Sequence, residues 1–190
     1  MSCGARSAGA GEIATARLRL VPVDLALARA MNLAPARAAE ALGATAGDGF
    51  PFSPGMYRYI AERLAVRPGD AGWYAWIAVH RRTGKVAGDG GFHGPPDDVG
   101  IVEIGYSVVP AWEGQGLATE MAQALVARAL ADPGVTAIRA ETLAGNAPSQ
   151  AILRRLGFAT AGEYDDPGDG RVIVWLLPRE RREAGSGGPA

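Results

Sequence analysis

Residues 102–120 read VEIGYSVVPAWEGQGLATE, a β-branched segment that passes through Pro110 and two glycines into an alanine-rich start of a helix. Glycine lets a backbone pass close to a ligand, and the first N–H groups of a helix have no intrahelical partners. Together with the positive end of the helix dipole they form a site for an anion. The segment therefore predicts a strand, a glycine turn and a helix whose start binds a phosphate or pyrophosphate.

The composition of the 190-residue chain predicts one domain over residues 12–182, with disordered ends at 1–11 and 183–190. The 19 basic and 20 acidic residues nearly balance, which gives no electrostatic case for nucleic acid or an anionic membrane as a partner. Cys3 is the only cysteine, so an internal disulfide and a cysteine metal cluster are excluded. No signal-peptide core is present at the N-terminus, and the apolar run 172–177 is far shorter than the ~20 residues that span a bilayer. We expect a cytoplasmic protein.

Hydrophobic periodicity on both sides of the glycine turn indicates an alternation of strands and helices. Strands are expected at 17–21, 73–79, 86–92, 100–109, 135–141, 158–164 and 172–177, and helices at 24–31, 56–64, 117–130 and 146–156. The three strands in series before the glycine turn imply an antiparallel meander. The sum is an α/β (α+β) fold with a mixed sheet and helices on both faces.

Two other phosphate-binding scaffolds fit less well. A P-loop ends in Gly-Lys-Ser/Thr, which this turn lacks. A Rossmann turn would use Gly114 and Gly116, with Glu141 on a ribose, but its third glycine position is Thr119. Rossmann glycines also follow the first strand of a parallel unit rather than a meander. A dinucleotide-binding oxidoreductase is therefore the weaker alternative.

Two motifs carry a family resemblance. The segment EGQGLA at 113–118, followed by Asn146-Ala147-Pro148-Ser149 and Leu-Gly-Phe at 156–158, resembles the GCN5-related N-acetyltransferase (GNAT) family. Within that family it is most similar to the group that acetylates the N-terminal amine, often alanine, of ribosomal proteins. The resemblance covers residues 17–179. One departure is Glu113, an acid at the family's Gln/Arg position.

The resemblance implies a mostly antiparallel central sheet, acetyl-CoA (CoA) as the acyl donor and no metal. It also implies an amine substrate as acceptor, either a peptide N-terminus or a small molecule, which would attack the thioester directly. Family members often form homodimers, and the sequence leaves that state open. Together with the family's motifs, these expectations predict an acetyl-CoA-dependent N-acetyltransferase. A non-catalytic acyl-CoA-binding or regulatory module is the alternative that Glu113 favours.

The resemblance also implies a set of cofactor-binding residues. They are Val108, Val109, Gly114, Gln115, Gly116, Leu117, Ala118, Thr119, Asn146 and Ser149. The strand segment 107–109 resembles the family's splayed fourth strand, whose free backbone groups bind pantetheine and polarise the thioester carbonyl. An ordinary paired strand is the alternative.

Glu103 is the expected general base, acting through a water, because it interrupts an apolar strand. A carboxylate on a half-buried strand is costly unless it is solvated or paired. A structural ion pair or an anchor for the substrate amine is therefore the alternative. The strand period places Glu103 on the face opposite Val102, Ile104 and Tyr106.

Ser149 is the expected general acid. Many family members carry a tyrosine acid seven residues after the motif asparagine, and that position is Leu153 here. Ser149 is the substitute that the resemblance implies, with a hydrogen bond to the thiol sulfur. A role as a helix cap is the alternative for Ser149, and Asn146 is expected to cap the same helix.

The remaining histidines and aromatic residues receive lesser assignments. His80 is expected at the surface, whereas His93 is a candidate for the acceptor pocket. Isolated histidines give no metal site. Core packing is expected for Trp73, Tyr74 and Trp76, and acceptor-side positions for Phe52 and Tyr57.

Overall fold

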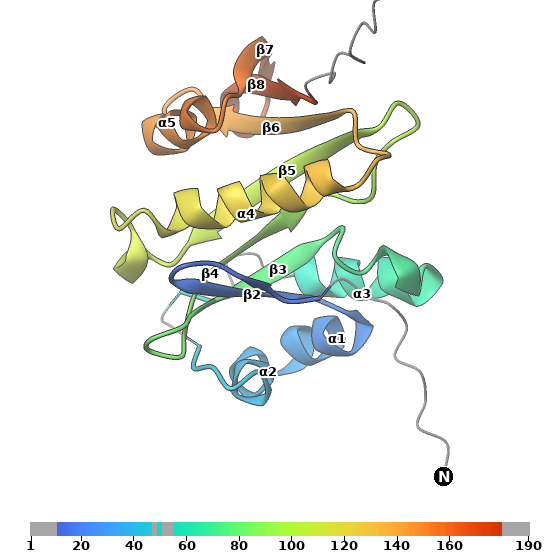
Figure 1. Ribbon diagram of the computed structural model, residues 1–190, viewed down its shortest axis with the longest axis vertical. Helices are drawn as coiled ribbons and strands as arrows, with labels where there is room; N and C mark the ends of the chain where they lie inside the picture. Colours follow the sequence, from blue (N-terminus) through green and yellow to red (C-terminus); the bar gives the residue numbers. More distant parts are fainter. Residues whose placement is uncertain (1–10, 47–48, 51–54, 180–190) are drawn as a thin grey trace, which may run out of the picture.

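The computed structural model describes residues 11–46, 49–50 and 55–179, so the ends expected to be disordered lie almost wholly outside the described residues. The chain forms one eight-stranded sheet in the order β1-β2-β3-β4-β5-β6-β8-β7 (Figure 1). Its strands are β1 (Ile13–Ala14), β2 (Leu18–Pro22), β3 (Ala75–His80), β4 (Lys85–Phe92), β5 (Ile101–Val108), β6 (Ala137–Leu143), β7 (Ala159–Asp166) and β8 (Gly170–Pro178). All neighbouring strands are antiparallel except β5 and β6, which confirms the mixed, mostly antiparallel sheet.

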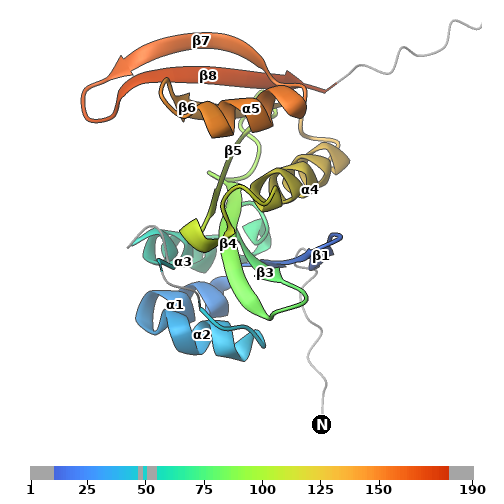
Figure 2. The same ribbon diagram turned by 90° about the vertical axis from the view of Figure 1, so that its left-hand side faces the viewer.

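Helices cover both faces of this sheet, as expected. They are α1 (Leu25–Leu33), α2 (Pro35–Ala41), α3 (Met56–Val66), α4 (Leu117–Ala131) and α5 (Ala147–Arg155), with short 3₁₀ turns η1 (Pro68–Asp70) and η2 (Pro110–Trp112). Figure 2 shows α1–α3 on one side of the sheet and α4 on the other. Among the described residues, no helix is long and apolar enough to cross a membrane.

Two hydrophobic cores follow from the alternation along β3. Trp76 and Ala78 point into the core shared with α4 and α5, whereas Ile77 and Val79 point into the core shared with α1–α3. Successive side chains of a strand face opposite sides of a sheet, so β3 is buried on both faces.

The sheet divides where β5 meets β6. The parallel pairing joins residues 101–104 to 137–140 and then ends. Beyond it, β5 stays paired with β4 as far as Val108, and β6 stays paired with β8 as far as Leu143. The two strands therefore diverge at the end that leads to the glycine turn, as the family resemblance implies.

Two details of the strands differ from the prediction. The two-residue strand β1 was not expected, because two residues are too few to show a period. Trp73 and Tyr74 precede β3 rather than opening it. Both residues are buried, so their apolar character reflects packing rather than strand structure.

Candidate active site

The glycine turn leads into α4 through two residues in the left-handed region. Gly114 has φ +69° and Gly116 has φ +76°, a conformation that favours glycine. Gly116 is the N-cap of α4 and has no side chain to cap it. The N–H groups of residues 117–119 therefore remain available to an anion at the end of the helix.

A clamp from the N-terminal segment fixes this turn. The Arg17 guanidinium donates to the Gln115 carbonyl (2.7 Å) through Nη1 and to Glu120 Oε2 (2.7 Å) through Nε. Thr15 Oγ1 and the Arg17 backbone N–H both donate to Glu120 Oε1, at 2.5 and 2.7 Å. Sequence reasoning did not find this clamp, because its partners lie about a hundred residues apart and neither carries a local signature.

Several predicted cofactor-binding residues are already engaged by the protein. The Gln115 carboxamide donates to the Ala111 carbonyl (3.0 Å) and so closes the turn. Leu117 is buried, which leaves its backbone N–H as its only polar contribution. The Val109 N–H donates to the Ala87 carbonyl (2.9 Å), and the Val109 carbonyl accepts from Trp112 (2.8 Å).

His80 is not at the surface, which corrects the prediction. Its side chain is 6% exposed, and its ring packs against Trp112 with the centroids 4.5 Å apart. Its Nδ1 hydrogen-bonds Thr83 Oγ1 at 3.0 Å. His80 thus supports η2, the segment directly ahead of the glycine turn.

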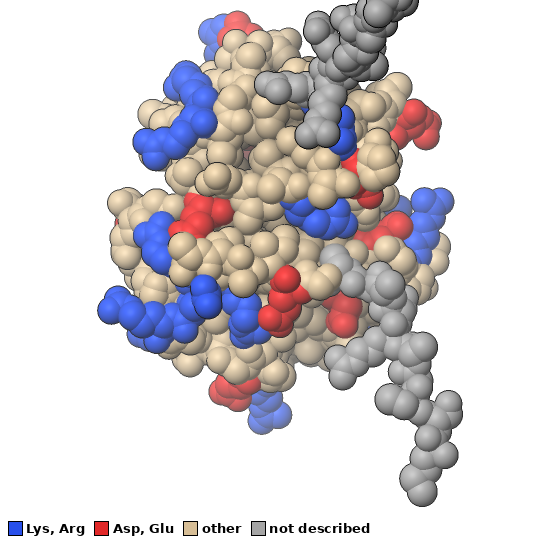
Figure 3. All heavy atoms as spheres, in the orientation of Figure 1, with Lys and Arg blue, Asp and Glu red and all other residues tan. Residues whose placement is uncertain are grey.

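Basic side chains flank the glycine turn. Arg17, Arg81 and Arg82 line a shallow hollow with His80. Figure 3 shows basic side chains gathered along the left edge of the molecule, the edge where α4 begins in Figure 1. Glu113 is exposed at the same turn, so its carboxylate is hydrated. The surroundings of the turn favour an anionic ligand despite this one acid.

The start of α5 lies across the divided sheet from β5. Asn146 Oδ1 accepts from the Ser149 N–H (3.1 Å), so Asn146 caps the helix as expected and Ser149 does not. Tyr106 Oη donates to the Ser149 carbonyl over 3.4 Å. Burial raises the pKa of Tyr106 to about 12, although the contact with Ser149 opposes this shift. Tyr106 therefore keeps its proton at neutral pH beside the predicted acid. The alternation along the strand predicted that Tyr106 lies on the face opposite Glu103, but it could not predict the contact of Tyr106 with Ser149.

Glu103 is paired through both carboxylate oxygens. Oε1 lies 2.9 Å from His93 Nδ1, and Oε2 lies 2.9 Å from Arg139 Nη1. The hydrogen bond with His93 lowers the pKa of Glu103, although burial opposes this, and the same bond raises the pKa of His93. Arg139 also pairs with Glu141, whose carboxylate accepts from Tyr164 (3.0 Å). The ion pair foreseen as the alternative is therefore present, and it connects Glu103 to a histidine.

His93 extends from this pair into open space. Its side chain is 69% exposed, against 20% for Glu103. A methyl group placed on Gly105 would lie 3.8 Å from His93 Nε2, so this nitrogen faces the floor formed by β5. Sequence reasoning gave His93 a minor part, because the register that sets it beside Glu103 depends on the loop between β4 and β5.

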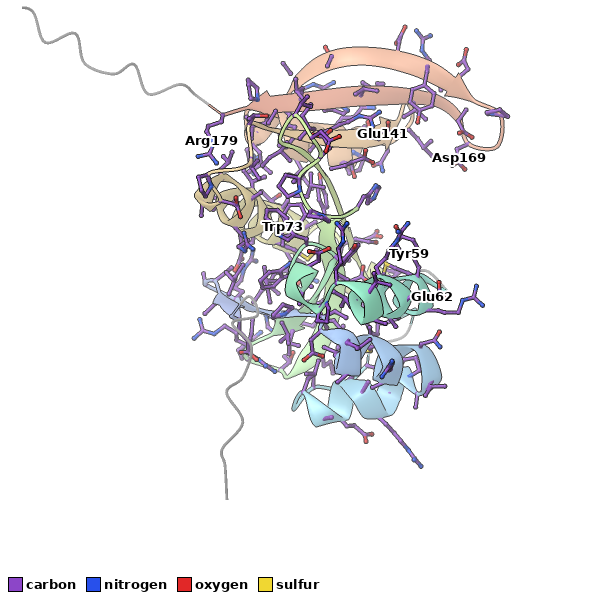
Figure 4. All side chains as sticks on the ribbon, turned by 90° about the vertical axis from the view of Figure 1, so that its right-hand side faces the viewer. Tyr59, Glu62, Trp73, Glu141, Asp169 and Arg179 are labelled. Atoms are coloured by element: carbon purple, nitrogen blue, oxygen red, sulfur yellow. The ribbon has the colours of Figure 1, made fainter. Side chains whose placement is uncertain are left out.

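A cavity of about 480 Å³ opens beside His93, between α3 and strands β3 to β5. Its lining includes Met56, Tyr59, Ile60, Tyr74, Asp89, Phe92, His93, Gly105, Tyr106 and Ser107. In Figure 4, Tyr59 stands on α3 below the opening and Glu141 lies above it on β6. We refer to this cavity as the β4–β5 pocket.

The aromatic assignments change in this pocket. Tyr74 lines it, although packing alone was expected of that residue. Tyr57 was expected on the acceptor side, but it is buried beneath the pocket and reaches it only through a hydrogen bond to Asp89. Phe52 lies outside the described residues.

Comparison with known proteins gives a consistent result. Residues 17–159 match the family model described as an acetyltransferase (GNAT) domain. The uncharacterized N-acetyltransferase YjdG of Bacillus subtilis is 33% identical over 146 residues, which cover 76% of this chain and 87% of that protein.

Solved structures show the same fold at lower identity. The ribosomal-protein-S5-alanine acetyltransferase of Vibrio fischeri has a TM-score of 0.67 and 15% identity, covering 90% of this chain and 98% of that chain. The ribosomal L7/L12 α-N-protein acetyltransferase RimL, in complex with coenzyme A, has a TM-score of 0.65 and 19% identity, covering 88% and 98%. With three quarters of its sequence matched by the family model and by a curated relative, the chain belongs to the GNAT family of acetyltransferases.

Proposed function

We propose that this protein transfers an acetyl group from acetyl-CoA to a primary amine by direct attack. The observation that carries the proposal is the path of β5. One end of this strand bears Glu103, which is bonded to His93 beside a ligand-sized pocket, and the other end leads into the glycine turn of α4. Ligand pockets of enzymes fall in this size range. A donor and an acceptor could thus meet along a single strand.

The residues at the divided sheet suit CoA. The uncapped N–H groups of residues 117–119, with Gly114, Gln115 and Gly116 in the turn, would hold the pyrophosphate. Val108, Val109 and Asn146 would flank the pantetheine arm, with Val109 contributing shape because its polar backbone groups are used internally. Acetyl-CoA supplies the activated thioester when it is bound.

His93 would take the proton from the acceptor. An alkylammonium has no lone pair, so the amine must be deprotonated before it attacks. His93 Nε2 faces the pocket, and Glu103 bonds the other ring nitrogen, which orients the imidazole and stabilises its cation. The hydrogen bond with His93, followed by the charge of Arg139, lowers the pKa of Glu103 and keeps it ionised. We therefore assign Glu103 a catalytic role that runs through His93 rather than through a water.

Ser149 would donate a proton to the departing thiolate. Because Asn146 caps α5, capping does not require the Ser149 side chain. Tyr106 fixes the Ser149 backbone and stays protonated, so it is a second donor at the same position. Both peptide N-termini and small amines fit the chemistry, and the ribosomal-protein enzymes with this fold acetylate proteins.

The proposal is tested in two stages. A thermal-shift screen should show stabilisation by CoA and acetyl-CoA but not by NAD, and stabilisation by NAD alone would contradict the assignment. Thiol release from acetyl-CoA is then measured with panels of peptides and small amines. We expect Glu103→Gln and Ser149→Ala each to lower the rate at saturating substrate by about tenfold or more. A protein that binds CoA without any turnover would instead be the non-catalytic module.

A further inference from the structure

Asp89 is a buried carboxylate that the proposed reaction does not use. It lies on β4, is 7% exposed and lines the β4–β5 pocket. In the part of the chain that the structure describes, Tyr57 Oη (3.2 Å) is its only hydrogen-bond donor. Burial raises the pKa of Asp89 to about 6, although the bond from Tyr57 lowers it. A buried charge with one partner is costly unless a second partner arrives.

Strand register places Asp89 at the end of the pocket away from His93. Asp89 pairs with Ser107 and Gly91 pairs with Gly105, while His93 donates its backbone N–H to Glu103. The two polar ends are therefore separated by a floor that carries no side chains. His93 Nε2 leans over Gly105 and Asp89 lies opposite Ser107, so the two groups stand over diagonal positions of the two strands, which are roughly 7–8 Å apart.

The walls between these two ends are aromatic. Tyr59 and Tyr74 line the pocket together with Met56 and Ile60, whereas the side chains of Phe92 and Tyr106 belong to the core under α4. Rings of this kind attract cations through their faces, and Tyr59 already holds the Arg63 guanidinium 5.1 Å from its centroid. A carboxylate at one end of an aromatic cavity is complementary to an ammonium group.

We propose that the acceptor is a small diamine, with one ammonium group held by Asp89 while the other amine faces His93. The spacing suits two nitrogens joined by roughly four methylene groups, since an extended chain of that length reaches across one diagonal pair of strand positions. This inference rests on the proposed acetyltransferase function and names its class of acceptor.

Matched acceptors test the proposal. Thiol release is measured with α,ω-diaminoalkanes of three to six carbons, with n-alkylamines of the same lengths and with a peptide bearing an N-terminal alanine. We expect kcat/KM to be highest for the four- and five-carbon diamines, about 30-fold or more above the matched monoamines. Equal rates for diamines and monoamines, or the highest rate for the peptide, would overturn the diamine assignment but leave the acetyltransferase function standing.

Two variants separate recognition from structure. Asp89→Asn keeps the size of the side chain and an acceptor for Tyr57, so we expect it to lose the preference for diamines while monoamine rates and the thermal shift with CoA stay the same. Asp70→Asn is the matched control, because Asp70 lies near Tyr74 but outside the pocket lining. A preference that survives in Asp89→Asn, or disappears equally in Asp70→Asn, contradicts the assignment. Absence of turnover with every amine would instead refute the proposed function.

Discussion

At the scale of single side chains, the bond between His93 and Glu103 determines how the rate depends on pH. This bond raises the pKa of His93, so the folded protein retains the imidazole proton to higher pH than free histidine does. Only the neutral ring accepts a proton, so kcat/KM should rise with pH as His93 deprotonates, with a midpoint above 6.5. Glu103→Gln removes the cause of the shift, and the midpoint should move to lower pH while the plateau falls. Thiol release measured across pH 5–9 gives both quantities.

Glu141→Gln is the control for this experiment. Glu141 binds Arg139 and raises the pKa of His93 only through its charge, a smaller cause than the bond to Glu103, so its loss should lower the midpoint much less than Glu103→Gln does. If Glu103→Gln leaves the midpoint unchanged, the titrating group is not His93. His93→Gln should in addition lower kcat by about 100-fold, the usual contribution of a positioned base.

Asp89 also makes a prediction about stability. Its pKa is about 6 in the folded protein, against 3.8 as the reference value, so the folded state binds the proton more tightly than the unfolded state. The free energy of unfolding should therefore fall as pH rises from about 4 to about 6, by up to about 3 kcal/mol in total. Asp89→Asn removes this loss. It should raise the free energy of unfolding at pH 7.5 by about 1–3 kcal/mol, which corresponds to a Tm higher by several degrees.

Denaturant titration at pH 7.5 and at pH 4 checks the stability effect. The advantage of Asp89→Asn should be large at the higher pH and small at the lower one, where the natural residue is protonated. A variant less stable than the natural protein at pH 7.5 would show that the carboxylate stabilises the fold, and Asp70→Asn provides the reference for an ordinary loss of charge.

At the scale of elements, the clamp between Arg17 and the start of α4 should control CoA affinity. The guanidinium reaches the Gln115 carbonyl and the Glu120 carboxylate at once, which a lysine ammonium cannot reproduce with the same geometry. Arg17→Lys should therefore loosen the glycine turn and raise the Kd for CoA about tenfold, which is a loss of about 1.4 kcal/mol of binding free energy. Isothermal titration calorimetry measures this directly.

Arg19→Lys is the matched control for the clamp. Arg19 is an arginine of the neighbouring strand β2 that bonds the Leu42 carbonyl and Glu12, away from α4. Its substitution should leave the Kd for CoA unchanged. Equal affinities for the Arg17→Lys and natural proteins would mean that the turn keeps its shape without the clamp.

The elements themselves were largely predictable, whereas their contacts were not. Alternation along β3, the Asn146 cap and the glycines before α4 are local patterns, and local physics determines them. The neighbours of Glu103 and Asp89 depend on the register between strands. A two-residue period gives the face of a side chain but not its partner on the next strand. Arg17 and Glu120 meet only because the sheet brings β2 under α4.

At the scale of the whole molecule, the sheet consists of two parts joined by a short parallel pairing. Strands β1–β5 form one part, and β6, β8 and β7 form the other. Only residues 101–104 pair with 137–140, yet the core beneath α4 includes side chains from both parts, such as Leu20 and Trp175. The parts therefore share apolar packing but few backbone bonds, and the proposed CoA site lies where those bonds stop.

This arrangement predicts where CoA should stabilise the molecule. A ligand between diverging strands contacts both parts, so its binding opposes their separation more than it opposes fraying elsewhere. At a CoA concentration of 100 times Kd the stabilisation is about 2.7 kcal/mol. Hydrogen exchange should show it as slower exchange in residues 101–108 and 137–178, with little change in 18–33. Protection that rises equally throughout the described chain would mean that the two parts open only together. NAD at the same concentration is the control ligand, and it should slow exchange in neither part.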